Sequence, residues 1–545
     1  MTRMTAGHAV VRQLVAEGID TVFAVPGYQI MHIYDGFHDS PEVRLVTCRH
    51  EQTAVFAADG YARTTGQIGV ALVVPGPGAY NAGAAMATAF ASNSPVLLVS
   101  GQMSTDEMGR EHGALHEIND QLDFMGPVAK WLRRAETAEE VPTLLHEAFR
   151  QLKTGRPQPV EVEIPQNYLA ESHDFDIIEP EEYPAAAADA ALVSQAASLL
   201  AGARRPAIVA GDGVVRARAG DDLERLATIL QAPVFLSTDA RGAMPDSHPL
   251  AFTAPHTAYS DRDALRLLRD ADVVLVVGGR VNSSAAKRME LEPGQTWVHV
   301  DVDPARLETA YEPSLTVQAD ARLAVTALAR DLERRELSSD WDPGLLAEVH
   351  DKRHRALEKA FPAQMGAMAD IKARLPDETV FVAGVTVGSR WFVAGVGAGR
   401  PGALLTSSYM TTLGYAFPTG LGAKVGNPNT PVISLSGDGG FMYAVGDLAT
   451  AVQYGINLVT LVFNNGKFGA SQYDQREGRF DNRIVGTYLR NPDLVALAGS
   501  FGALGLRVDR LDDLPDIIMQ AVDAERPVVV DVCGDAMAEL DILFR

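Results

Sequence analysis

Two short polar segments of the chain carry the side chains best suited to chemistry. The segment 437–440 reads Gly-Asp-Gly-Gly, the segment 464–467 reads Asn-Asn-Gly-Lys, and each directly follows an apolar run. We expect the two apolar runs to be adjacent parallel strands joined by a helix over 443–454, because buried parallel strands are near-continuous apolar runs. Asp438 and Asn465 would then lie at the carboxyl ends of neighbouring strands, where open α/β sheets bind their ligands.

The residue types at these positions are those that a magnesium ion and a diphosphate require. Mg²⁺ prefers about six oxygen ligands and usually combines one or two carboxylate or carbonyl groups with phosphate oxygens, which suits Asp438 and the Asn465 amide. The glycines let the backbone approach phosphate, and a helix beginning near Phe441 would point N–H groups at the same anion. Either segment alone is also an ordinary turn. Their pairing favours a site for Mg²⁺ carrying a diphosphate.

This pair of segments resembles the signature of enzymes that depend on thiamine diphosphate. The resemblance implies that Mg²⁺ is bound by the Asp438 carboxylate, the Asn465 amide and the main-chain carbonyl of Lys467. It also implies that the residues around these ligands contact the cofactor, namely Gly437, Asp438, Gly439, Gly440, Asn465, Lys467, Phe468 and Gly469.

A second and independent match lies far upstream, at 47–52 and 57–63. It resembles the pyrimidine-binding segment of the same family, in which a glutamate, here Glu51, hydrogen-bonds the aminopyrimidine ring and promotes loss of the reactive proton of the cofactor. Glu51 by itself could equally be a surface acid favoured at a helix start by the helix dipole, and the metal motif favours the catalytic interpretation. Gly27 and Pro75 lie in further matching segments and are expected at the cofactor.

Other cofactor contacts are implied by the register of the family. Leu413 stands where the family wedges a large apolar side chain between the two cofactor rings, and plain core packing is the rival interpretation. Thr411 stands where a main-chain carbonyl holds the amino group of the pyrimidine. Gly384, Val385 and Gly388 align with the loop that contacts the diphosphate, and these apolar residues would have to make that contact through the backbone.

Length and composition bound the class of protein. A chain of 545 residues corresponds to roughly three domains at about 150 residues each. No apolar run reaches the roughly 18 residues that cross a membrane, and the N-terminus lacks the apolar core of a signal peptide, so we expect no membrane segment and a cytoplasmic location. The formal net charge of −23 argues against non-specific binding of nucleic acid.

The order of the predicted elements indicates the fold class. Strand-like runs alternate with amphipathic helical segments, which predicts an α/β fold with three doubly wound parallel-sheet domains. By resemblance these are a pyrimidine-binding domain over 1–175, a central domain over 190–335 and a diphosphate-binding domain over 360–545. The acidic stretch 178–191, rich in Pro and Ala, is the predicted first linker.

Two polar residues are candidates for acting on the substrate beside Glu51. His116 stands where acetolactate synthases and benzaldehyde lyase place a Gln near the reacting carbons. An imidazole can act as general acid or base near neutral pH, although a lone loop histidine is more often a surface residue. Gln29 is the second candidate polar group.

The leading prediction is a Mg²⁺- and thiamine-diphosphate-dependent decarboxylase and carboligase acting on a 2-oxo acid, similar to acetolactate synthase. The alternatives are benzaldehyde-lyase-like cleavage or formation of 2-hydroxy ketones (acyloins), and 2-hydroxyacyl-CoA or oxalyl-CoA lyase chemistry. A non-catalytic paralogue is disfavoured because Glu51, Asp438 and Asn465 are all present. The segment 252–256 reads Phe-Thr-Ala-Pro-His where flavin enzymes of the family carry glycines, which argues against FAD. In the family Glu51 and Asp438 meet across a subunit interface, which predicts a homodimer or homotetramer.

Overall fold

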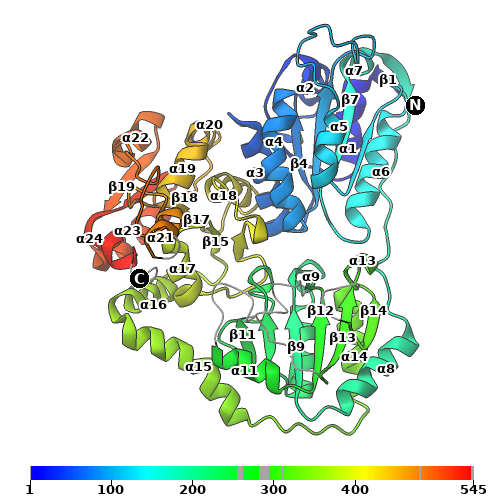
Figure 1. Cartoon of the computed structure of the whole chain (residues 1–545). Coiled ribbons are helices and arrows are strands. Elements are labelled where there is room, and N and C mark those ends of the chain that lie inside the picture. Colours follow the sequence, from blue (N-terminus) through cyan, green and yellow to red (C-terminus); the bar gives the residue numbers. More distant parts are fainter. Residues whose placement is uncertain (1, 254–261, 281–293, 308–311, 478–479, 542–545) are drawn as a thin grey trace. The chain divides into compact units, whose positions relative to one another are not determined.

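The computed structural model describes residues 2–253, 262–280, 294–307, 312–477 and 480–541 (Figure 1). The chain forms two compact units, and each is described by itself. Unit 1 comprises Met1–Tyr183, Val380–Ser389 and Ser407–Arg545, and unit 2 comprises Pro184–Thr379 and Arg390–Thr406. Three six-stranded sheets, each accompanied by helices, confirm the predicted fold class of three α/β domains. The boundaries 1–175, 190–335 and 360–545 stay predictions.

The N-terminal domain is built on one parallel sheet. Its strands are β2 (Thr21–Ala24), β3 (Arg44–Thr47), β4 (Gly69–Val73), β5 (Val96–Gln102), β6 (Trp131–Arg134) and β7 (Val160–Pro165). They pair in the order β3-β2-β4-β5-β7-β6. The helices are α1 (Ala6–Ala16), α2 (Met31–His38), α3 (Glu51–Thr65), α4 (Pro77–Ala91), α5 (Gln121–Met125), α6 (Val141–Lys153) and α7 (Gln166–Ala170). An antiparallel pair, β1 (Thr2–Thr5) with β8 (Ser172–Phe175), lies outside this sheet.

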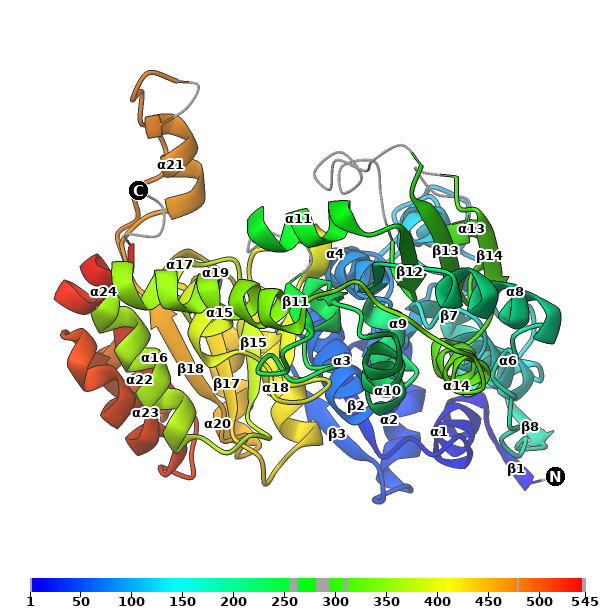
Figure 2. The ribbon, with the colours of Figure 1, turned by 90° about the horizontal axis from the view of Figure 1, so that it is seen from below.

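The C-terminal domain repeats this plan. Its strands are β15 (Val380–Ala383), β16 (Leu404–Thr406), β17 (Val432–Gly437), β18 (Val459–Phe463), β19 (Leu504–Val508) and β20 (Val528–Val532), in the order β16-β15-β17-β18-β20-β19. Its helices are α17 (Val387–Trp391), α18 (Ala416–Gly426), α19 (Asp438–Ala444), α20 (Leu448–Gln453), α21 (Gly469–Glu477), α22 (Leu494–Phe501), α23 (Leu514–Val522) and α24 (Gly534–Leu540). Figure 2 shows α21 extending away from the sheet that contains β17 and β18.

Unit 2 contains the central sheet. Its strands are β9 (Pro206–Ala210), β10 (Val234–Leu236), β11 (Ala251–Thr253), β12 (Val273–Val277), β13 (Thr296–Asp301) and β14 (Leu315–Gln318), in the order β11-β10-β9-β12-β13-β14. The helices are α8 (Ala190–Ala201), α9 (Asp212–Arg216), α10 (Gly220–Leu230), α11 (Arg262–Asp270), α13 (Pro304–Leu307), α14 (Ala321–Leu332), α15 (Pro343–Ala360) and α16 (Pro362–Arg374).

Alternate strand residues of the central sheet enter two different cores. Ile208 and Leu275 pack with α8, α10 and α14, whereas Val209 and Val276 pack with α11 and α15. Both faces of the sheet are therefore covered, which explains why its strands are apolar throughout rather than alternating.

The helix predicted over 443–454, with a start near Phe441, differs from the structure. Helix α19 already begins at Asp438, because Gly437 is its extended N-cap residue. The helical segment is then interrupted by a 3-10 turn, η6 (Val445–Asp447), before α20 begins. The carboxylate of Asp447 is engaged by groups outside α19, as described below, and an apolar period alone does not indicate such an interruption.

Helices α3 and α18 join the N-terminal and C-terminal domains within unit 1 at unusually close range. A β-carbon at Gly422 would lie 1.7 Å from the carbonyl oxygen of Ala57, and one at Gly60 would lie 2.0 Å from that of Thr419. At the same contact the buried Arg63 pairs with Asp59 and donates a 2.9 Å hydrogen bond to the Tyr415 hydroxyl. The two backbones touch because both helices carry glycine where they cross.

Among the described residues, no helix is long and apolar enough to cross a membrane. This finding agrees with the sequence, which has no apolar run of that length.

The contact between α3 and α18 predicts that replacing two different helical glycines by alanine has opposite effects on stability. We expect Gly422→Ala to destabilise the protein by about 1–3 kcal/mol or more, because overpacking against a backbone carbonyl forces the helices apart. Gly499→Ala is the matched control: Gly499 lies inside α22 with no atom within 4 Å of its β-carbon position, so alanine should raise stability by about 0.5–1 kcal/mol. Thermal unfolding midpoints measure both changes, and equal midpoints for the two variants would contradict the account.

Candidate active site

The predicted metal ligands lie at the carboxyl ends of two adjacent strands. β17 and β18 pair in parallel with Gly437 opposite Phe463, so the segments that follow them emerge side by side. Asp438 is buried, and its Oδ2 accepts hydrogen bonds from the Gly466 N–H at 3.0 Å and from Asn491 Nδ2 at 2.6 Å. The Asp438 carboxylate is thus held directly against the segment that carries Asn465 and Lys467.

The electrostatics of Asp438 suit a bound cation. Burial raises the pKa of this carboxyl above its usual range, and the donors from Asn491 and the backbone counteract the rise. In the part of the chain that the structure describes, no Lys, Arg or His side chain pairs with Asp438. A buried carboxylate with dipolar donors but no counter-ion is costly by itself, and a divalent cation would offset that cost.

Asn465 and Lys467 can offer neutral oxygen atoms to a metal ion, whereas the positive charge of Lys467 is paired elsewhere. Asn465 Oδ1 accepts a 3.3 Å hydrogen bond from the Lys467 N–H. The Lys467 ammonium is occupied elsewhere, by an ion pair of 2.6 Å with Asp541. One carboxylate, one amide oxygen and one main-chain carbonyl form a donor set of the hard oxygen type that Mg²⁺ prefers.

Close packing also explains why glycine is found at positions around Asp438. A β-carbon at Gly439 would lie 2.6 Å from the Phe468 ring, and one at Gly440 would lie 3.6 Å from Leu413 Cδ1. One at Gly388 would lie 2.2 Å from the Phe463 ring. The predicted cofactor residues Gly439, Phe468, Gly440 and Leu413 are therefore neighbours in space.

The remaining predicted residues of the C-terminal domain lie on loops and helix starts. Gly384 directly follows β15, and a β-carbon there would lie 3.0 Å from the Leu435 carbonyl oxygen. Val385 follows it and is 54% exposed. Thr411 has the left-handed φ of 48°, which an L-residue adopts rarely, and Gly469 is the first residue of α21.

Glu51 is the first residue of α3 and meets the first turns of α4, the helix that follows the next strand along the chain. The His50 side chain caps this helix by accepting from the Gln52 N–H, and Glu51 Oε2 accepts a 2.9 Å hydrogen bond from Asn81 Nδ2. A β-carbon at Gly78 would lie 3.5 Å from Glu51 Oε1. The half-buried Glu51 carboxylate therefore lies beside the start of α4, which directly follows Pro75 and Gly76.

Gly27 and Pro75 lie at the connection between β4 and the start of α4. A β-carbon at Gly27 would lie 2.2 Å from Val74 Cγ1, so the backbone after β2 passes close to the end of β4. The ring of Pro75 lies 3.1 Å from the β-carbon position of Gly101, near the end of β5. The structure thus brings Gly27, Pro75 and Glu51 to the carboxyl ends of neighbouring strands.

Asp447 is a residue of this region that the sequence interpretation missed. Its buried Oδ1 accepts hydrogen bonds from the Arg49 N–H at 2.7 Å and the Thr450 hydroxyl at 2.8 Å. Burial raises the pKa of Asp447, and hydrogen bonds from Thr53, Arg49 and Thr450 counteract that effect. The C-terminal domain thereby fixes the backbone just before Glu51. The only sequence signal is an acid placed where an apolar helix was expected.

His116 and Gln29 are brought together in the N-terminal domain. Gln29 is buried and its Nε2 donates a 3.2 Å hydrogen bond to the Leu115 carbonyl, next to His116. His116 has a left-handed φ of 66°. Gln29 Oε1 and His116 Nδ1 are both buried and lack a hydrogen-bond partner among the described residues. Unpartnered buried polar atoms on a strained loop are the features expected of residues kept for a ligand.

Comparisons with known proteins agree with this geometry. An α/β protein with a buried acid at the ends of two parallel strands has the arrangement in which open sheets bind their ligands. Residues 4–124 match the N-terminal, 193–328 the central and 384–532 the C-terminal domain of thiamine pyrophosphate enzymes, of which the first and last are described as thiamine pyrophosphate binding. The chain belongs to the thiamine pyrophosphate (thiamine diphosphate) enzyme family.

Several curated relatives extend over nearly the whole chain. It is 30% identical to an acetolactate synthase from Mycobacterium bovis, over 99% of this chain and 90% of the relative. It is 29% identical to a probable acetolactate synthase large subunit from Methanocaldococcus jannaschii, over 99% and 93%. It is 33% identical to a probable 2-ketoarginine decarboxylase from Pseudomonas aeruginosa, over 94% and 90%. The chain is thus a thiamine-diphosphate-dependent enzyme similar to acetolactate synthases.

The segment used above to argue against FAD is described only in part. Phe252 and Thr253 end β11, whereas Ala254, Pro255 and His256 lie outside the described residues. The expectation that FAD is not bound stays a prediction.

Asn491 offers a test of the site that leaves the predicted ligands intact. Its amide donates to Asp438 and also to Asn464 Oδ1, at 2.9 Å. We expect Asn491→Ala to weaken Mg²⁺-dependent cofactor binding about 10- to 100-fold, as is typical when a residue that orients a metal ligand is lost. A Mg²⁺ titration at fixed thiamine diphosphate, followed by protein fluorescence, measures this.

The control is Asn167→Ala in the N-terminal domain, where the amide bonds only to Thr105. This variant should bind as the wild type does. Unchanged Mg²⁺ affinity in the Asn491 variant would show that the amide does not support Asp438.

Proposed function

We propose that the protein is a Mg²⁺- and thiamine-diphosphate-dependent decarboxylase and carboligase acting on a 2-oxo acid. The observation that carries the proposal is the buried Asp438 carboxylate, which is held by hydrogen-bond donors at the ends of β17 and β18 and has no counter-ion among the residues that the structure describes. Similarity to proteins named acetolactate synthase and 2-ketoarginine decarboxylase supports a 2-oxo acid as the substrate class.

On this proposal the diphosphate side of the site binds and orients. Asp438, the Asn465 amide and the Lys467 carbonyl hold Mg²⁺, and Gly384, Val385 and Gly388 meet the diphosphate through their backbone. Leu413, which borders the β-carbon position of Gly440, supports the bent shape of the cofactor, and the carbonyl of Thr411 holds its pyrimidine amino group. The remaining proposed cofactor contacts are Gly27, Pro75, Gly437, Gly439, Gly440, Phe468 and Gly469.

The pyrimidine side moves protons. When bound, thiamine diphosphate supplies a nucleophilic carbon that attacks a carbonyl and an electron sink that accepts the pair released on C–C cleavage. Glu51 holds a proton at the pyrimidine ring, and the Asn81 amide orients its carboxylate. His116 and Gln29 act next to the substrate, where His116 Nδ1 can hold or transfer a proton and Gln29 Oε1 can accept a hydrogen bond, since both atoms lack a partner among the described residues.

The proposal is tested by CO₂ release from pyruvate and a panel of larger 2-oxo acids, including 2-ketoarginine, with products identified by mass spectrometry. We expect CO₂ with at least one acid, and a loss of about 10²- to 10⁴-fold in kcat in Glu51→Gln, because a positioned acid or base contributes about that factor. Glu42→Gln, which changes an exposed acid of the same domain, should retain wild-type activity. No CO₂ from any acid, with cleavage of a 2-hydroxy ketone, would move the assignment to a lyase.

We also propose that the protein is a homodimer or homotetramer. Large apolar side chains are exposed next to the proposed cofactor residues: Tyr28 is 69% exposed beside Gly27, and Tyr443 is 63% exposed at the end of α19. Exposed apolar groups gathered at a site commonly mark an interface. Sedimentation of the cofactor-loaded enzyme should give a dimer or tetramer, and an active monomer would contradict the proposal.

A further inference from the structure

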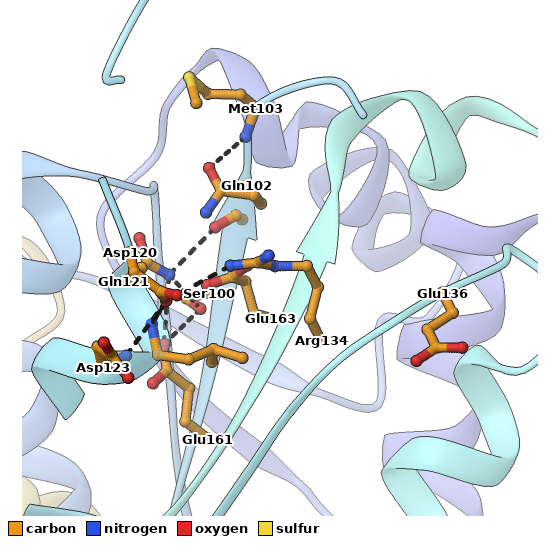
Figure 3. Close-up of polar contacts among 12 residues, drawn as sticks. Ser100, Gln102, Met103, Asp120, Gln121, Asp123, Arg134, Glu136, Glu161 and Glu163 are labelled. Carbon is orange, nitrogen blue, oxygen red and sulfur yellow. Dashed lines mark hydrogen bonds and ion pairs between the residues drawn. The ribbon is translucent and has the colours of Figure 1, made fainter. Parts of the chain in front are cut away.

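Two glutamates lie side by side inside the N-terminal domain. Glu161 and Glu163 are two residues apart on β7, so both side chains leave the same face of the strand. Both are fully buried. Figure 3 shows them between Ser100 of β5, Gln121 of α5 and Arg134 of β6. None of these residues belongs to the proposed cofactor site. Burying two carboxyl groups next to each other costs free energy unless partners or bound protons compensate their charges.

The two acids have different partners. Arg134 forms an ion pair with Glu163 and lies 3.8 Å from Asp120. Glu161 instead accepts hydrogen bonds from neutral groups, the Ser100 hydroxyl at 2.7 Å and Gln121 Nε2 at 3.3 Å. Glu163 therefore has a cation to support its charge, whereas the hydrogen-bond partners of Glu161 among the described residues are uncharged.

The titration of Glu161 follows from these surroundings. Burial raises the pKa of Glu161 to about 8; the Glu163 charge raises it further, whereas Ser100, Gln121 and Arg134 lower it. Burial also raises the pKa of Glu163, but the Arg134 guanidinium opposes that rise. The charged groups facing the pair are Arg134 from β6 and Asp120 just before α5. Glu161, whose partners are neutral, is therefore the acid of the pair that is better suited to keep a proton near neutral pH.

A chain of hydrogen bonds leads from Glu161 to the loop beside Glu51. Gln121 Nε2 also donates to the Ser100 hydroxyl at 2.9 Å, and Gln121 Oε1 accepts a 3.1 Å hydrogen bond from the Gly76 N–H. Gly76 has a left-handed φ of 59°, and a β-carbon there would lie 2.5 Å from the His116 carbonyl oxygen. Gly76 is the N-cap residue of α4, and Gly78 in the first turn of that helix borders Glu51.

We propose that Glu161, as a neutral carboxyl, is a positioning residue that holds the Gly76 loop through Ser100 and Gln121. The loop in turn sets the places of Glu51 on one side and of the His116 carbonyl on the other. Ionisation of Glu161 puts a second negative charge beside Glu163 and strengthens the hydrogen bonds that Ser100 and Gln121 donate to Glu161, which draws the Gln121 amide toward Glu161 and away from the Gly76 N–H. The loop that borders the pyrimidine side of the site then loses its fixed position.

The first test is cofactor affinity as a function of pH, which needs no substrate and so does not depend on the proposed reaction. We expect the dissociation constant of Mg²⁺–thiamine diphosphate from the wild type to rise above pH 8, by at most about tenfold per pH unit, because binding requires the protonated form. Fluorescence titrations from pH 6.5 to 9.5 measure it.

Glu161→Gln supplies the decisive comparison because the amide is neutral at every pH and nearly the same size. This variant should bind the cofactor as the wild type does at pH 7 and keep that affinity to pH 9.5. Glu163→Gln is the matched control: it removes the neighbouring charge, so the alkaline loss should remain but begin at lower pH. The same alkaline loss in Glu161→Gln as in the wild type, or no alkaline loss in the wild type, overturns the proposal.

Gln121→Met tests the relay itself, because it preserves length but removes the acceptor for the Gly76 N–H. We expect at least a tenfold loss of cofactor affinity at every pH, with a thermal midpoint showing that the protein is folded. Wild-type affinity in this variant would show that the Gly76 loop does not depend on Gln121.

Thermal unfolding of the cofactor-free protein gives an independent readout. The pKa of Glu161 is raised from 4.5 to about 8 on folding, so between these values the folded protein keeps a proton that the unfolded chain releases. Stability from this group therefore falls as pH rises through that window and is constant above it. The difference in thermal unfolding midpoint between Glu161→Gln and the wild type should therefore increase in favour of the variant from pH 5 to pH 8. Above pH 8 this difference should stay constant. A constant difference between the two midpoints from pH 5 to pH 8 would contradict a neutral Glu161.

Discussion

The close crossing of α3 and α18 is the constraint on which the site in unit 1 depends. Glycines at the crossing bring the helix backbones into contact, with Gly422 against the Ala57 carbonyl and Gly60 against that of Thr419. Because Glu51 is the first residue of α3, this crossing fixes the direction from which its carboxylate emerges. Because Leu413 lies three residues before α18, the same crossing also fixes the loop proposed to shape the cofactor.

Buried acids have distinct tasks in this unit. Asp438 is surrounded by hydrogen-bond donors and has no counter-ion in the described part of the chain, which suits a cation. Asp447 receives donors from both domains and holds the backbone before Glu51. Glu161 accepts only from neutral groups and is suited to keep its proton. Burial raises the pKa of all three carboxyls, and the partners decide which of these tasks each performs.

The parts of the fold that local patterns encode could be predicted from the sequence. Apolar runs followed by Gly-Asp-Gly and Asn-Asn-Gly gave adjacent strands β17 and β18 with Asp438 and Asn465 at their ends. Glu51 was expected at a helix start, and it is the first residue of α3. These features depend on the period of apolar residues and on turn chemistry, both of which are local.

The contacts that position the ligands could not be predicted in this way. Asp447 meets Arg49 from a position 398 residues away, and Asn491 meets Asp438 across 53 residues. Which polar residue finds which partner depends on tertiary packing that a linear pattern does not contain. The short edge strand β6 was missed for a different reason: Trp131–Arg134 ends in two arginines, and one face of an edge strand can be polar.

The most direct test of the central claim is a calorimetric titration of thiamine diphosphate into the purified protein, with Mg²⁺ and with a chelator, for the wild type and for Asp438→Asn. The account predicts saturable binding that requires the divalent cation and is lost or greatly weakened in Asp438→Asn, because the amide cannot supply the charge that the buried site uses to bind the metal. Equally tight binding in the chelator, or unchanged binding in Asp438→Asn, would contradict it.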